Sequence, residues 1–185
     1  MKSNVGFTLI ELIVAMAIAA IVLTLGIPSF RETINNNRLT AGANELVSAL
    51  HLARSEAVKR NVRVTLCKSA DGATCTTSGG YEQGWIVFVD RNSNGAVNAG
   101  EEIIRSYSAL PGGMTLLGGT DVSNVISYVS AGVAQQLNGA MLTAGNTTWT
   151  LCKPGYATSA RQLVLGVGGR MQVTTQQPAS AAGCS

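Results

Sequence analysis

The stretch that decides the fold is Met1–Phe30, MKSNVGFTLIELIVAMAIAAIVLTLGIPSF. Between Phe7 and Ile27 the only ionisable side chain is Glu11, and the next charge is Arg31. At about 1.5 Å rise per residue, a helix of this length spans the roughly 30 Å hydrocarbon core of a bilayer. We therefore predict a membrane-spanning helix over residues 7–27.

Glu11 is the exception within this apolar segment. A carboxylate at membrane depth is costly unless something pairs with it, so such a residue is a candidate for function. The structural alternative places Glu11 near the membrane interface, where its carboxylate reaches the lipid headgroups.

Residues 6–11, GFTLIE, follow a short leader whose only charged side chain is Lys2. This pattern resembles the class III signal of type IV prepilins and type II secretion pseudopilins. The resemblance implies that prepilin peptidase removes the leader peptide, residues 1–6, by cutting between Gly6 and Phe7. It also implies N-methylation of Phe7 and assembly with other major and minor pilins or pseudopilins. In that family the glutamate, here Glu11, pairs with the freed amino terminus of a neighbouring subunit.

Beyond Pro28, which should kink or locally open the helix, the sequence becomes amphipathic. The apolar stripe consists of Leu39, Ala43, Leu46, Leu50, Ala53 and Ala57, and the opposite side carries Arg38, Glu45, Arg54, Glu56, Lys59 and Arg60. This spacing predicts that residues 28–61 continue the helix to about Arg60 and pack on a globular domain. A soluble coiled coil is the alternative.

Residues 62–185 change to short β-branched runs between glycine-rich turns, which predicts an α+β fold with one or two antiparallel sheets resting on the helix. The predicted strands are Val62–Lys68, Gly84–Asp90, Glu102–Ser108, Met114–Leu117, Val125–Ser130, Thr147–Lys153, Gln162–Val167 and Arg170–Thr174. The last residues, Thr175–Ser185, have no periodic pattern.

The cysteines and the charged residues indicate the cellular compartment of the domain and the kinds of partner it can bind. Because Lys2 is the only charge in the leader, the positive-inside rule keeps the N-terminus cytoplasmic and sends the domain outward. Four cysteines in that compartment predict two disulfides, with three connectivities available. We favour Cys67–Cys75, which closes a short loop, and Cys152–Cys184, which attaches the C-terminal tail to the sheet. The cysteine spacing matches no zinc motif, and a net charge of +3 is too mild to indicate nucleic-acid binding.

The long kinked helix, the run GWIVFVD at residues 84–90, the Asn-Gly turn that follows and a late GGR resemble the GspH/FimT family of minor pilins and pseudopilins, which includes the FimU type. The resemblance implies a minor pilin of a type IV pilus, made as a single-pass bacterial inner-membrane precursor with its domain in the periplasm, that primes or caps the filament. A GspH-like pseudopilin of type II secretion and a FimT-like DNA-binding minor pilin for natural transformation are the alternatives. A plain anchored domain that never assembles leaves Glu11 unexplained.

A loop after GWIVFVD fits the calcium pattern D-x-[DN]-x-[DN]-G-x5-E. Its oxygen ligands would come from Asp90, Asn92, Asn94, the Ala96 carbonyl and Glu101. Only two of these five are anionic, and Asn-Gly between strands is a common hairpin signal. We interpret the loop as a metal-free hairpin, with calcium as the alternative cofactor.

The GGR sequence, residues 168–170, is the region in which FimT-type DNA-uptake pilins carry a Gly-Arg-x-Arg motif. This chain has Arg170 but places Gln172 at the second arginine position. Arg170, Arg161 and Lys153 would make a thin footprint for DNA phosphates, and the alternative is a solvated arginine on a turn.

No catalytic constellation is visible in the sequence. His51 is the only histidine, and it lies among Leu50, Leu52 and Ala53 on the predicted helix without a nucleophile nearby. The residues indicate that the protein is not an enzyme.

Overall fold

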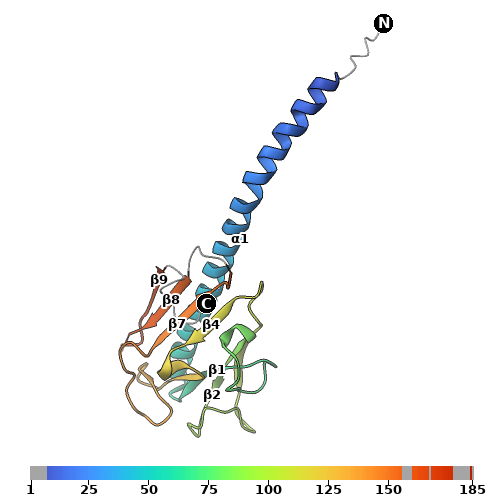
Figure 1. Cartoon of the computed structure of the whole chain (residues 1–185). Helices are drawn as coiled ribbons and strands as arrows, with labels where there is room; N and C mark the ends of the chain where they lie inside the picture. The colour runs from blue at the N-terminus through green and yellow to red at the C-terminus, as the bar shows by residue number, and fades with distance from the viewer. Residues whose placement is uncertain (1–7, 156–159, 167, 177–183, 185) are drawn as a thin grey trace. The chain divides into compact units, whose positions relative to one another are not determined.

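The computed structural model describes residues 8–155, 160–166, 168–176 and 184, and it leaves the side chains of residues 25–29 and 176 undescribed. The chain divides into two compact units, residues 1–37 and 38–185. The boundary falls inside the long helix α1, Leu9–Arg60. The second half of α1 therefore belongs to the same unit as the strands (Figure 1).

Helix α1 ends at Arg60, as the sequence predicts. Asn61 follows with φ +50°, the left-handed conformation that commonly terminates a helix and that asparagine tolerates better than most residues. The Val62 amide then donates to the Ala57 carbonyl at 3.3 Å. The secondary structure of α1 is unbroken at Pro28, where the sequence predicts a kink or local opening.

Every residue of the predicted apolar stripe is buried. Leu39, Ala43, Leu46, Leu50, Ala53 and Ala57 are 0–3% exposed, and Ala49 joins them. Three of the four alanines recur in the last part of the helix, and their small side chains let the sheets approach the backbone closely. The stripe thus packs on the domain, and within the described residues it is not left open for a coiled coil.

All the strands predicted from the sequence are present, in two antiparallel sheets. The five-stranded sheet has the order β3-β2-β1-β5-β6, and the four-stranded sheet has the order β4-β7-β8-β9. Their bounds are β1 Val64–Lys68, β2 Trp85–Val89, β3 Ile103–Tyr107, β4 Thr115–Gly118, β5 Val125–Tyr128, β6 Ala134–Gln135, β7 Thr148–Cys152, β8 Ala160–Leu165 and β9 Met171–Gln176. The two-residue strand β6 was not predicted, because so short a strand leaves no alternation to detect.

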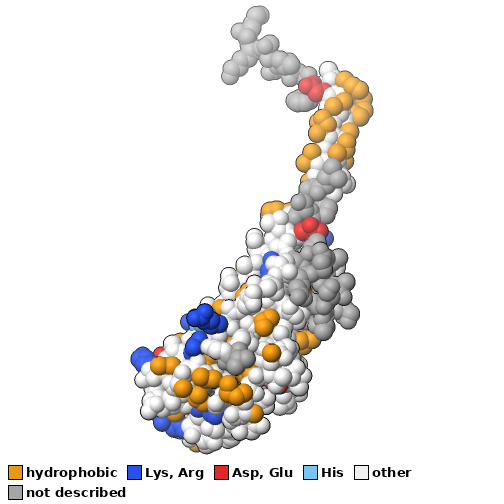
Figure 2. Space-filling model, turned by 90° about the vertical axis from the view of Figure 1, so that its left-hand side faces the viewer, with side chains coloured by type: hydrophobic (Ala, Val, Ile, Leu, Met, Phe, Trp, Pro, Cys, Tyr) orange, Lys and Arg blue, Asp and Glu red, His pale blue; other side chains and the backbone are white. Residues whose placement is uncertain are grey.

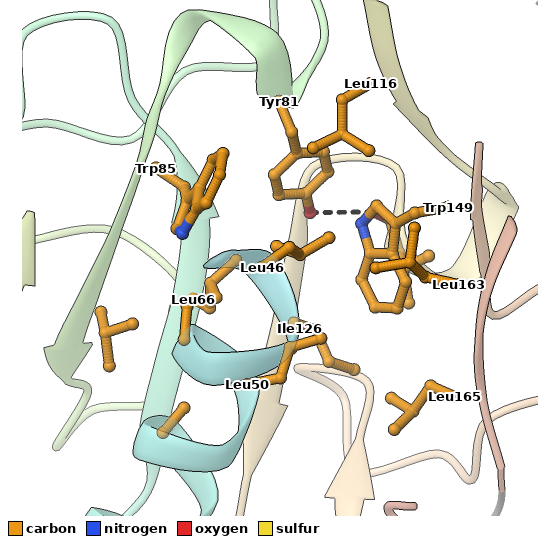
Figure 3. Close-up of a cluster of buried hydrophobic side chains, with 14 of the residues drawn as sticks. Leu46, Leu50, Leu66, Tyr81, Trp85, Leu116, Ile126, Trp149, Leu163 and Leu165 are labelled. Atoms are coloured by element: carbon orange, nitrogen blue, oxygen red, sulfur yellow. Dashed lines mark hydrogen bonds between the residues drawn. The ribbon is translucent and has the colours of Figure 1, made fainter. Parts of the chain in front are cut away.

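The core lies between α1 and the two sheets and is built around large aromatic side chains. Trp85, Trp149 and Tyr81 are fully buried, with Leu46 and Leu50 of α1 among them (Figure 3). Tyr81, in the short 3-10 helix η1 (Tyr81–Gln83), meets Trp149 edge-on, with ring centroids 6.2 Å apart. Its hydroxyl donates to a backbone carbonyl at 2.8 Å in the second 3-10 helix, η2 (Thr120–Val122), and burial raises the pKa of this phenol.

The central strands of the five-stranded sheet are buried on both faces. Trp85 and Val87 of β2 join the main core, while Ile86 and Phe88 form a second cluster with Cys67 of β1. This explains why GWIVFVD reads as a continuous apolar run instead of an alternating one.

Two disulfides hold the loops, Cys67–Cys75 and Cys152–Cys184, and these are the pairings favoured from the sequence. Beside the first, Lys68 is only 3% exposed. Its ammonium donates to the carbonyls of Thr77 at 3.2 Å and Gly79 at 2.6 Å. Desolvation lowers the pKa of Lys68.

Two charged residues of α1 on the side opposite the apolar stripe are partly buried. Arg54 donates to the Gly169 carbonyl at 3.1 Å. Glu56 pairs with Arg60 at 2.5 Å, and Arg60 also contacts Glu102 at 2.6 Å. The hydrogen bond from Arg60 lowers the pKa of the Glu56 carboxyl. The sequence did not indicate this partial burial, because a helical pattern does not show which parts of the chain close over the edge of a helix.

Candidate functional site

The first described half of α1 is covered with exposed hydrophobic side chains (Figure 2). They are Leu9, Ile10, Leu12, Ile13, Val14, Met16, Ile18, Ile21, Val22, Leu23 and Phe30, each between 49% and 77% exposed. A helix that is apolar on all sides is stable only when lipid or other helices cover it. This segment is therefore a surface made to be buried by something outside the described chain.

Glu11 lies in the first turn of α1 and is exposed among these apolar residues. Thr8 precedes the helix, and its hydroxyl oxygen accepts a hydrogen bond from the Glu11 amide at 3.4 Å. Thr8 is thus the N-cap, and Thr-x-x-Glu is the pattern of a capping box. The spacing of Thr8 and Glu11 in the sequence is the signal that could have predicted this role. The positive end of the helix dipole also favours a carboxylate at this position.

The predicted cleavage pair, Gly6 and Phe7, lies outside the described residues. The predicted membrane segment, residues 7–27, is described only in part. Among the described residues, no helix combines the length and the hydrophobicity needed to cross a membrane.

The GGR sequence forms the turn between β8 and β9. Gly169 has φ +73° and is buried, its amide donates to the Gly166 carbonyl at 2.8 Å, and its carbonyl accepts from Arg54. Only glycine adopts this conformation readily. The glycine of the motif therefore has a structural role, and Arg170 beside it is exposed.

The structure does not bring the three predicted DNA-binding cations together. In the β8–β9 pairing, Leu165 lies opposite Met171 next to Arg170, whereas Arg161 lies opposite Thr175 at the other end. The two ends are four residue steps apart along the strand, about 13 Å at 3.3 Å per residue. Lys153, which follows β7, is near Arg161 and not near Arg170.

The carboxylates of the loop that fits the calcium pattern are hydrogen-bonded within the protein. Asp90 accepts from the Thr65 hydroxyl at 2.9 Å and from the amides of Asn94 and Gly95, both at 3.1 Å. The other ligands of the set behave similarly, as Glu101 accepts from two backbone amides, the Asn94 side chain accepts from the Ala96 amide, and Asn92 donates to Asn98. In the described part of the chain no three His, Cys, Asp or Glu side chains are grouped as a metal site. The donor set thus serves the turn itself.

Two family models match this chain. The prokaryotic N-terminal methylation motif matches residues 1–27, and the model described as type II transport protein GspH matches residues 42–169. The second match covers more than half of the chain. The chain belongs to the GspH family. It is a type IV minor pilin or pseudopilin of the GspH/FimT group.

One curated protein and two solved structures are similar to this chain. The chain is 35% identical over 97 residues to the pilin-like protein PilA1 of Thermus thermophilus, a match that covers 52% of this chain and only 55% of that relative. The crystal structure of the type IV minor pilin FimU of Pseudomonas aeruginosa superposes with a TM-score of 0.55 at 19% identity, covering 81% of this chain and 97% of FimU. That likeness shows the pilin-like α+β fold. The minor pseudopilin EpsH of Vibrio cholerae superposes with a TM-score of 0.47 at 13% identity, covering 74% of this chain and 96% of EpsH.

Membership of the GspH family implies assembly with other pilins and processing by prepilin peptidase. The family consists of structural proteins. His51 is exposed on α1.

Proposed function

We propose that the protein is a minor pilin of a type IV pilus that primes or caps the filament. It is made as a bacterial inner-membrane precursor with its globular domain in the periplasm, and prepilin peptidase cuts it between Gly6 and Phe7. Phe7 is then N-methylated. The observation that carries the proposal is the apolar surface of α1 around a single carboxylate, Glu11.

Glu11 would act in assembly by charge pairing. Its carboxylate meets the amino terminus of a neighbouring subunit, which cleavage has freed. Both charges then lie among apolar helices, and removal of one partner leaves the other buried and unpaired at a cost of about 3–5 kcal/mol. Thr8 supports this role because its N-cap bond holds the first turn that carries Glu11.

Two relatives favour the pilus over secretion. PilA1 is a pilin-like protein, and FimU is a type IV minor pilin. The description of the matching family, type II transport protein GspH, favours the second candidate, a minor pseudopilin of type II secretion. The FimT-like DNA receptor is the weakest candidate, because Arg170 is far from Arg161 and Lys153 along the β8–β9 hairpin.

A deletion strain distinguishes these functions. The strain is complemented with the wild-type gene, with Gly6→Val or with Glu11→Ala, and Glu45→Ala serves as an exposed matched control on the same helix. Sheared surface pili, cleavage of the precursor, secreted protein and DNA uptake are measured. We expect pili to be lost on deletion and restored by the wild type and Glu45→Ala. Gly6→Val should remain uncleaved, and Glu11→Ala should be cleaved but should not restore pili.

Unchanged pili with lost secretion would refute the pilus proposal in favour of the pseudopilin. Normal cleavage of Gly6→Val would refute the proposed processing site. Full rescue of pili by Glu11→Ala would refute the pairing role of Glu11.

A further inference from the structure

Two positively charged side chains, Arg38 and Lys153, lie against a glycine turn of the globular unit. Gly112 and Gly113 have φ values of +82° and +64° and connect β3 to β4. The Lys153 ammonium donates to the Gly112 carbonyl and lies 3.4 Å from the Gly113 carbonyl. Arg38 of α1 lies against the same turn, since a Cβ on Gly112 would be 2.8 Å from its Nη1. Because Gly112 and Gly113 have no side chains, both Arg38 and Lys153 can lie close to the backbone of this turn.

Arg161 of β8 adds a third positive charge. It lies opposite Leu151 of β7, so Lys153, two residues further along, shares its face of the sheet as a diagonal neighbour about 7–8 Å away. Nη2 of Arg161 donates to the Thr40 hydroxyl at 3.3 Å, and Thr40 comes two residues after Arg38 on α1. Nη1 is buried without a hydrogen-bond partner among the described atoms. We call Arg38, Lys153 and Arg161 the cation cluster.

The cation cluster lacks a negative partner within the described residues. The ion pairs there join Glu56 to Lys59 and Arg60, and Arg60 to Glu102, and none involves the cluster. Three like charges brought together by α1, β7 and β8 repel one another, and an external anion with several oxygens relieves that repulsion. Buried donors without an acceptor are likewise unfavourable. The cluster therefore has the chemistry of a phosphate-binding surface.

We infer that the cation cluster binds the phosphates of anionic phospholipid headgroups. The inference rests on the membrane anchoring in the proposed function. Arg38 comes soon after the predicted membrane segment, residues 7–27, in the chain, so anchoring of that segment keeps the first residue of the cluster within a short length of chain of a lipid surface. A lipid surface suits a small cluster better than DNA does, because the affinity for DNA depends on the number of phosphates neutralised and three cations neutralise few. Arg170, the residue expected on DNA, is not in the cluster.

The test uses the full chain in nanodiscs of phosphatidylcholine, with or without phosphatidylglycerol as about a third of the lipid. The melting temperature of the globular domain is measured at low and at high salt. We expect phosphatidylglycerol to raise the melting temperature by about 5 °C. Each cation near an anionic surface strengthens binding about fivefold, and binding to the folded domain stabilises it against unfolding. High salt should reduce the rise. Arg38→Gln alone should reduce it, and Arg38→Gln with Lys153→Gln should abolish most of it.

Arg170→Gln is the matched control, since it removes an exposed arginine outside the cluster and should keep the full rise. All variants must keep their melting temperature in pure phosphatidylcholine, and Arg38→Gln remains informative if the double variant does not fold. The inference is overturned if phosphatidylglycerol gives no rise, if Arg170→Gln loses as much as Arg38→Gln, or if duplex DNA added to phosphatidylcholine nanodiscs gives the larger, cluster-dependent rise. A chain that does not enter nanodiscs refutes the anchoring and with it this inference, whereas entry without a lipid effect refutes the inference alone.

Discussion

Replacement of Leu46 by alanine tests whether the packing of the second half of α1 against both sheets stabilises the fold. Leu46 is fully buried, and it lies between Trp85 on one side and Trp149 on the other (Figure 3). A buried Leu→Ala change costs about 2–5 kcal/mol, more where the surroundings cannot collapse into the space. Because aromatic rings from two sheets fix the shape of this site, we expect a loss of about 3–4 kcal/mol in the free energy of unfolding. Alanine is also the better helix former, so reduced helix propensity cannot account for the loss.

The assay is urea denaturation of a disulfide-bonded fragment of residues 31–185, followed by tryptophan fluorescence. Trp85 and Trp149 are both buried, so unfolding transfers both indoles into water. Glu45→Ala, at an exposed position next to Leu46, is the control and should change the free energy by no more than about 0.5 kcal/mol. A loss below about 1 kcal/mol for Leu46→Ala, with an unchanged urea dependence, would refute the packing argument.

Three further predictions concern the loops. Millimolar calcium should leave the melting temperature unchanged. Asp90→Ala should lower it, because the Thr65 hydroxyl and two backbone amides lose their acceptor. A calcium-dependent rise in melting temperature that Asp90→Ala abolishes would show that the loop binds calcium. Cys184→Ser should cost about 4 kcal/mol by the loop-entropy estimate, since the bond to Cys152 spans 32 residues; an unchanged urea midpoint would contradict it. Hydrogen bonds from Thr74, Ala73 and Ser69 hold the pKa of Asp71 below its ordinary value of 3.8. The Asp71 carboxylate therefore stabilises the fold above that pH, and this stabilisation is lost as the pH falls towards the lowered pKa. The melting temperature of Asp71→Asn should fall less steeply in acid than that of the wild type, and identical pH profiles would exclude a stabilising role for Asp71.

The sequence was sufficient to predict an element where apolar residues recur at the spacing of a helix or a strand. The stripe of Leu39, Ala43 and Leu46 repeats at helical spacing, and all three are buried. The β-strands were found because turns with glycine separate them, although strand ends differed, as β8 begins at Ala160 and β9 ends at Gln176. Such ends depend on pairing with a neighbouring strand, which a single strand does not encode.

The sequence by itself determined the apolar helix with its lone Glu11, the resemblance carried by residues 6–11, and the α+β class. These depend on residue type and spacing along one helix or strand. Only the tertiary structure decided that Arg54 holds the Gly169 turn, that Arg170 lies apart from Arg161, and that Arg38 joins Lys153 at Gly112. Each of these contacts joins residues far apart in the chain, and they meet because two sheets close over one helix.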